Sequence, residues 1–122
     1  MISEGRAPGT GHRTGHLAAS IGRRSLAAMA AWLVERRLTQ VSSRLKDLRD
    51  ELSMIDEQLD VFSDDADNAD IRALVSETPG AAFEANDARK HRDAMQKHRA
   101  HVVEKIAELE QRQDDLLDQL SS

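Results

Sequence analysis

The stretch "VERRLTQVSSRLKDLRDELSMIDEQLDVF", residues 34–62, decides the fold of this chain. Its large apolar residues recur at steps that alternate between four and three, at Val34, Leu38, Val41, Leu45, Leu48, Leu52, Ile55, Leu59 and Phe62. An average spacing of about 3.5 residues is typical of a helix that packs along a narrow apolar seam against another helix. The pattern therefore predicts a long helix over residues 25–62.

A second seam lies near the C-terminus. Its positions follow the same alternating steps, at Met95, Arg99, Val102, Ile106, Leu109, Gln113, Leu116 and Leu120, and its upstream part is the more polar. The preceding "SETP", residues 76–79, favours a helix start, because Ser76 or Thr78 can cap free amides and Pro79 suits the first turn. No helix breaker follows, and we predict a second long helix over residues 79–120.

The segment between the two seams, "DDADNADIRALVSE", residues 64–77, predicts a short connecting helix over residues 66–75 after an aspartate-rich start. We expect an apolar plug that closes the tip, made by Phe62, Ile71, Leu74, Val75 and Phe83. A short connection favours antiparallel packing of its neighbours. The predicted fold is all-α, an antiparallel coiled-coil hairpin of two long helices with a short connecting helix at its tip, over residues 17–122.

Residues 1–16, "MISEGRAPGTGHRTGH", contain four of the six glycines and one of the two prolines, so we predict a disordered, mildly basic tail. Met29 offers an alternative start of translation. Arg23 and Arg24 precede an apolar run, as in a twin-arginine export signal. The run over residues 26–34 is far shorter than the ~20 residues that span a bilayer, and we therefore expect a cytoplasmic protein without membrane contact.

Charge is distributed unevenly along the chain. The formal net charge of −5 combines nine bases and three acids in residues 1–49, one base and twelve acids in residues 50–88, and seven of each in residues 89–122. A hairpin would place the acidic residues 50–60 beside the basic residues 89–101, which supports antiparallel pairing. There is no cysteine, which excludes disulfides and thiolate metal sites.

The sequence carries no nucleophile-and-base arrangement and no glycine-rich phosphate loop, so we expect no enzyme activity. We also expect no cofactor. The histidines His91, His98 and His101 lie among basic residues that disfavour a cation, and they form no HExxH motif. The aspartates from Asp65 onward lack the glycine and the final glutamate of an EF-hand loop, although carboxylates at a tip could still hold hydrated magnesium.

A two-helix hairpin leaves part of each seam in water, while ordering the backbone opposes folding by ~1 to 2 kcal/mol per residue. We therefore predict self-association, as a dimer with four helices, or docking on a larger protein partner. Trp32 lies outside the seam beside basic residues, and it is a candidate contact residue. Nucleic-acid binding by the N-terminal arginines is an alternative, which the net acidic charge and the scarcity of aromatic residues disfavour.

The acidic tip contributes four further candidate contact residues, Asp64, Asp65, Asp67 and Asp70. In layout the predicted hairpin resembles the Gre-type and DksA-type factors, which insert a hairpin with an acidic tip into the secondary channel of RNA polymerase. The Gre-type S-E-N tip pattern and the DksA-type zinc cysteines are absent. The sequence, rich in Ala, Arg and Asp, also resembles those of uncharacterised small coiled-coil proteins of high-GC actinobacteria.

These observations favour a non-enzymatic protein–protein interaction module, either a small oligomeric coiled-coil scaffold or an accessory subunit of a larger machine. The alternative is a transcription-modulating factor whose acidic tip enters RNA polymerase. A purely structural role competes with both functions. In that case the tip aspartates only cap a helix and keep the turn soluble.

Overall fold

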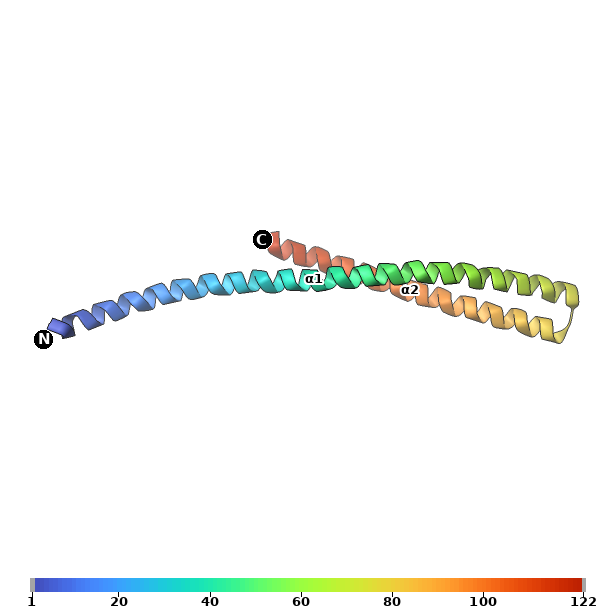
Figure 1. Cartoon of the computed structure of the whole chain (residues 1–122), viewed down its shortest axis with the longest axis horizontal. Helices are drawn as coiled ribbons and strands as arrows, with labels where there is room; N and C mark the ends of the chain where they lie inside the picture. The colour runs from blue at the N-terminus through green and yellow to red at the C-terminus, as the bar shows by residue number, and fades with distance from the viewer. Residues whose placement is uncertain (1, 122) are drawn as a thin grey trace.

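The computed structural model describes the backbone of residues 2–121 and the side chains of residues 22–121. This part of the chain is all-α, with helix α1 (Ile2–Ser76), helix α2 (Pro79–Ser121) and no strand. The helices pack side by side as an antiparallel helical hairpin (Figure 1). At ~1.5 Å per residue α1 is about 110 Å long and α2 about 65 Å, so the N-terminal part of α1 extends beyond the end of α2.

The bounds of α1 include residues 2–16, where the sequence predicts a disordered tail. The side chains of this segment lie outside the described residues, and the tail therefore stays a prediction. From residue 22 onward none of the described helices carries an apolar run long enough to cross a membrane.

The core of the hairpin is the predicted seam. Its buried residues come from both helices, and they are Val41, Leu45, Leu48 and Ile55 of α1 with Val102, Ile106 and Leu116 of α2. Partly buried seam residues extend the cluster at Val34, Leu38, Leu52, Met95 and Leu109. The alternating spacing therefore identified the face on which the two helices meet.

The separate short helix predicted over residues 66–75 is wrong, because α1 runs without a break to Ser76. The seam spacing continues past Phe62 through Ala66, Ala69 and Ala73, and the first two are fully buried. On α2 the same spacing begins with Ala81, Ala85 and Ala88, of which Ala85 is fully buried. Alanine favours a helix and leaves room for two backbones to approach, so the tip needs no bend in α1.

The predicted apolar plug is also wrong. Ile71, Leu74, Val75 and Phe83 are all exposed, and Phe62 is only half-buried. Because α1 continues the seam helix without a break, the alanines occupy the face toward α2. The larger side chains at positions 71, 74 and 75 then fall on the opposite face.

Two residues, Glu77 and Thr78, join the helices. The amide of Glu77 donates a hydrogen bond to the Ala73 carbonyl at 3.1 Å. Glu77 has a φ of 52°, so α1 is followed by a residue in the left-handed conformation that often terminates helices. Thr78 caps α2, since its Oγ1 accepts a hydrogen bond from the Ala81 amide at 3.2 Å. Pro79 then occupies the first helical position. Proline has no backbone N–H, and at this position an N–H would have no partner within the helix.

Polar contacts between the helices flank the seam in its middle part. Arg99 Nε donates to Asp56 Oδ1 at 2.6 Å, and His98 Nε2 lies 3.4 Å from Glu51 Oε1. These pairs join the acidic stretch of α1 to the basic stretch of α2, as the charge distribution predicts. Each exposed pair contributes only ~0.2 to 1 kcal/mol, so its main effect is on alignment.

A polar seam residue also contributes to the alignment nearer the open end. Gln113 occupies a seam position of α2, and its Nε2 donates to Ser42 Oγ of α1 at 3.0 Å. Arg49 and Glu110 form a further exposed ion pair across the helices at 3.4 Å. A glutamine at a seam position favours the one register in which its amide finds a partner.

Candidate functional site

The part of α1 that extends beyond α2 is the first candidate contact surface. We call residues 22–33 the extension, because Val34 is the first residue of α1 that packs on the core. Its large apolar side chains, Leu26, Met29, Trp32 and Leu33, are all exposed. Figure 1 shows this part of α1 with no second helix beside it. An apolar helix face of this kind is a candidate for contact with another protein.

Trp32 stands on the extension close to the hairpin. It is 53% exposed, and the Arg36 guanidinium carbon lies 5.4 Å from the centre of its ring. This cation–π contact holds the indole against its own helix while leaving a broad apolar surface in water. A shallow groove of about 470 Å³ beside the ring is lined by Trp32, Glu35, Arg36, Thr39 and Gln40. The tryptophan therefore lies where a partner could cover it.

The four tip aspartates do not share one environment. Asp64, Asp65 and Asp67 are exposed, and no described residue forms an ion pair with them. Asp70 is half-buried, and its Oδ1 lies 3.5 Å from an Arg89 nitrogen. Asp70 therefore differs from the other three, because it has a basic partner on α2.

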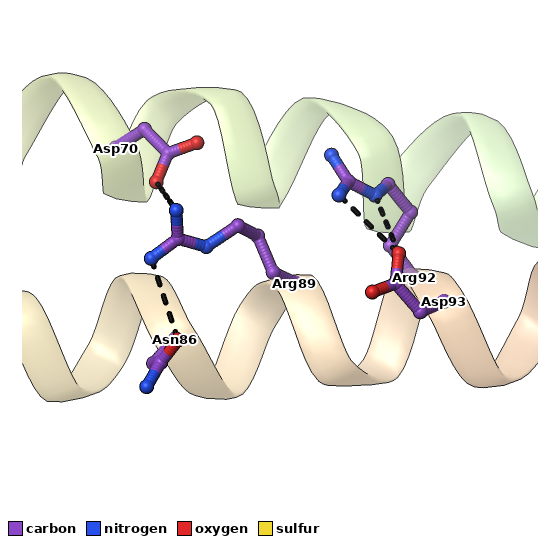
Figure 2. A network of polar contacts seen from close by, with 5 residues as sticks. All are labelled: Asp70, Asn86, Arg89, Arg92 and Asp93. Atoms are coloured by element: carbon purple, nitrogen blue, oxygen red, sulfur yellow. Dashed lines mark hydrogen bonds and ion pairs between the residues drawn. The ribbon is translucent and has the colours of Figure 1, made fainter.

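Arg89 is the residue that joins the two helices near the tip (Figure 2). One of its terminal nitrogens contacts Asp70 of α1, and the other donates to Asn86 Oδ1 on its own helix at 3.4 Å. One turn further along α2, Arg92 donates from Nε and from a terminal nitrogen to Asp93 Oδ1, at 3.3 Å each. Asp70 and Arg89 thus contribute to the alignment of the hairpin, which leaves three aspartates as free candidates.

The apolar residues at the tip form a second candidate contact surface. Ile71, Leu74 and Val75 lie within a stretch of five residues on the face of α1 that points away from α2, and each is exposed. In the predicted apolar plug these three residues would lie in the interior. The signal that places them outside is the seam spacing itself, since its continuation selects Ala66, Ala69 and Ala73 for the buried face.

The histidines of α2 lie along one side of the hairpin. The His91 ring is tilted by 58° against the Phe62 ring with 6.2 Å between centroids, and His98 contacts Glu51. An apolar groove of about 380 Å³ is lined there by Phe62, His91, Ala94, Met95 and His98. Among the described residues no three His, Asp or Glu side chains come together as a possible metal site.

Comparison with known proteins finds no matching family model, no similar curated protein and no similar solved structure. The function of this chain is therefore argued from the surfaces of its own fold.

Proposed function

We propose that this protein is a non-enzymatic protein–protein interaction module, built as an antiparallel coiled coil. The observation that carries the proposal is the extension, residues 22–33, a helix with four large exposed apolar side chains beyond the end of α2. A contiguous apolar surface on a helix loses water when a partner covers it, at ~25 cal/mol per Å² of buried area. Tryptophan and arginine, both present here, are the side chains that most often dominate such contacts.

The seam supports the coiled-coil part of this proposal. The seam positions follow steps of four and three, and each is buried or half-buried over residues 34–73 of α1 and 81–116 of α2. This spacing lets two helices wind around each other. A paired rod of this kind holds its two ends about 60 Å apart. Such a protein can act as a small oligomeric scaffold or as an accessory subunit that bridges two points of a larger machine.

Site-specific photo-crosslinking in the native cell tests the proposal. A photoreactive amino acid replaces Trp32 in one variant and Glu108, an exposed residue of α2, in a matched control. We expect protein adducts from position 32 and few or none from position 108. If position 32 gives no protein adduct, or if both positions give the same set, the extension is not a contact surface and the proposal fails.

A second candidate function is favoured by the exposed aspartates. Asp64, Asp65 and Asp67 lie nine to twelve residues before the end of α1 at Ser76, about 14 to 18 Å from the turn at ~1.5 Å per residue. They lie in the half of the rod that would enter the secondary channel of RNA polymerase. Transcription by purified RNA polymerase, with and without this protein, measures the effect. Replacing the three aspartates by asparagine abolishes the effect if the tip acts in the channel.

The matched control for that experiment removes the same number of exposed carboxylates from α2, at Glu104, Glu108 and Asp114. A tip function predicts that this control keeps full activity. If both triple variants lose the effect on transcription to the same extent, the loss reflects net charge alone and the second candidate function is rejected.

A further inference from the structure

The exposed large apolar side chains of α1 lie on one face of the helix. Along the described part of α1 they are Leu26, Met29, Trp32, Leu33, Met54, Val61, Ile71, Leu74 and Val75. Relative to the seam, each falls in one of the three heptad positions that point farthest from α2. We call this set the outer stripe. It runs from the extension to the tip, so it joins the two candidate contact surfaces on one side of the rod.

The two ends of the outer stripe carry opposite charge. Around the extension the exposed charged residues are Arg23, Arg24, Arg36 and Arg37, with Glu35 as the one acid. At the tip end of α1 and directly after it they include Asp60, Asp64, Asp67 and Glu77, with Arg72 as the one base of that segment. A basic apolar surface and an acidic apolar surface on the same molecule are complementary to each other. They cannot meet within one chain, because ~60 Å of rigid helix separates them.

A second copy of the chain, laid antiparallel along the outer stripe, brings these surfaces together. When Trp32 of one copy lies opposite Ile71 of the other, equal steps in opposite directions place further matched residues opposite each other. These pairs are Met29 with Leu74, Arg36 with Asp67, and Lys46 with Glu57. The same register therefore matches two apolar pairs near each end and two oppositely charged pairs between them, whereas Leu26 and Leu33 lie opposite Glu77 and Asp70.

We propose that the outer stripe is a homodimer interface, in which the extension of each copy covers the tip of the other. This inference rests on the proposed function and names a second copy as the partner of its contact surface. The two-fold axis passes near Glu51 and Leu52, so each end-to-end contact occurs twice and the assembly closes. A parallel dimer would instead place arginines against arginines and aspartates against aspartates.

The size and the periodicity of the outer stripe suit this arrangement. Its three heptad positions supply about 20 residues a side between Leu26 and Val75, the lower end of what a stable interface uses. Because the positions of the stripe repeat every seven residues, as those of the seam do, two α1 helices can wind around each other while each keeps its α2. The dimer is then a four-helix assembly with the α1 helices at its centre.

Cysteine crosslinking tests the antiparallel register, since the chain has no native cysteine. Full-length Met29→Cys and Leu74→Cys variants are prepared separately, mixed, and oxidised. We expect a disulfide between position 29 of one chain and position 74 of the other. Disulfides that join position 29 to position 29 at the same rate would show parallel or random encounter and overturn the proposal. Glu108→Cys mixed with Met29→Cys serves as the control for chance collisions.

Sedimentation of the purified full-length protein measures the dimer itself. Leu74 is 77% exposed and Phe83, on the outer side of α2, is 73% exposed, so neither supports the fold of one chain. Leu74→Glu is expected to raise the dissociation constant of the dimer at least ~100-fold, because the loss of one buried leucine occurs twice. Phe83→Glu, which also replaces an exposed apolar side chain by glutamate but off the stripe, is expected to leave the dissociation constant unchanged. Equal weakening by both variants would place the interface elsewhere.

Charge reversal separates this inference from the proposed function. Lys46→Glu and Glu57→Lys should each weaken the dimer severalfold, and the double variant should restore it. A monomer at all concentrations, or no restoration in the double variant, overturns the dimer. If Trp32 still crosslinks to a different protein in the cell, the interaction module stands without the dimer. If position 32 crosslinks to nothing, both fail.

Discussion

Leu45 is the most buried large side chain of the hairpin, at 1% exposure in the middle of the seam. Replacing it by alanine removes its contacts with the core cluster and leaves a gap between the helices. Leucine-to-alanine changes in cores destabilise by ~2 to 5 kcal/mol, and the two helices can partly close the gap, so we expect about 2 to 3 kcal/mol. For a domain of this size that lowers Tm by roughly 10 to 20 °C.

Thermal unfolding followed by far-UV circular dichroism, at one protein concentration, measures this effect. Leu117→Ala is the matched control, because it is the same leucine-to-alanine change at a helical position that is 48% exposed. The control is expected to lower the free energy of unfolding by less than ~1 kcal/mol. Equal Tm values for the two variants would mean that the seam is not the core, and the reasoning would be refuted.

Three further predictions concern the turn and the tip, each measured by urea unfolding. Thr78→Ala removes the cap of α2 and should destabilise by ~1 kcal/mol, and an unchanged midpoint would show that the cap is dispensable. Glu77→Gly should stabilise by up to ~1 kcal/mol, because glycine adopts the observed φ of 52° without strain, whereas destabilisation would contradict this reading. Ala66→Leu should destabilise by ~1 to 3 kcal/mol through overpacking, unlike Ala107→Leu on the exposed face.

The seam was predictable from the sequence, because helical geometry alone determines which side chains share a face. Val41, Leu45 and Ile106 follow the alternating spacing, and they are buried in the structure. The antiparallel direction was also predictable. It follows from the short connection and from the charges that meet at Asp56 and Arg99.

The tip could not be predicted in the same way, because side-chain size and seam spacing compete there. Ile71, Leu74 and Val75 are the largest apolar residues of the segment, and size alone argues for their burial. The structure instead buries Ala66 and Ala69, which keep the register of the upstream seam. A continuous helix cannot rotate its seam face between one turn and the next, so the register prevails over size.

The candidate site residues also divide into those whose environment follows from the sequence and those whose environment depends on the packed structure. Trp32 was predicted outside the seam, and its exposure follows directly from its heptad position. The pairing of Asp70 with Arg89 depends on which residues of α2 face the tip of α1, and the spacing within one helix does not contain that information. Only three of the four predicted tip aspartates therefore remain free of an ion pair with described residues.

The sequence by itself determined the all-helical class, the buried seam and the start of the second helix at Pro79, because these depend on local periodicity and on the residues that start helices. The tertiary structure decided where each helix ends relative to the other, since only the paired lengths of α1 and α2 show that residues 22–33 lack a packing partner within the described chain. It also decided that one face of α1 carries a basic apolar end and an acidic apolar end. Both follow from packing, because a residue is exposed or covered only once the neighbouring helix is in place.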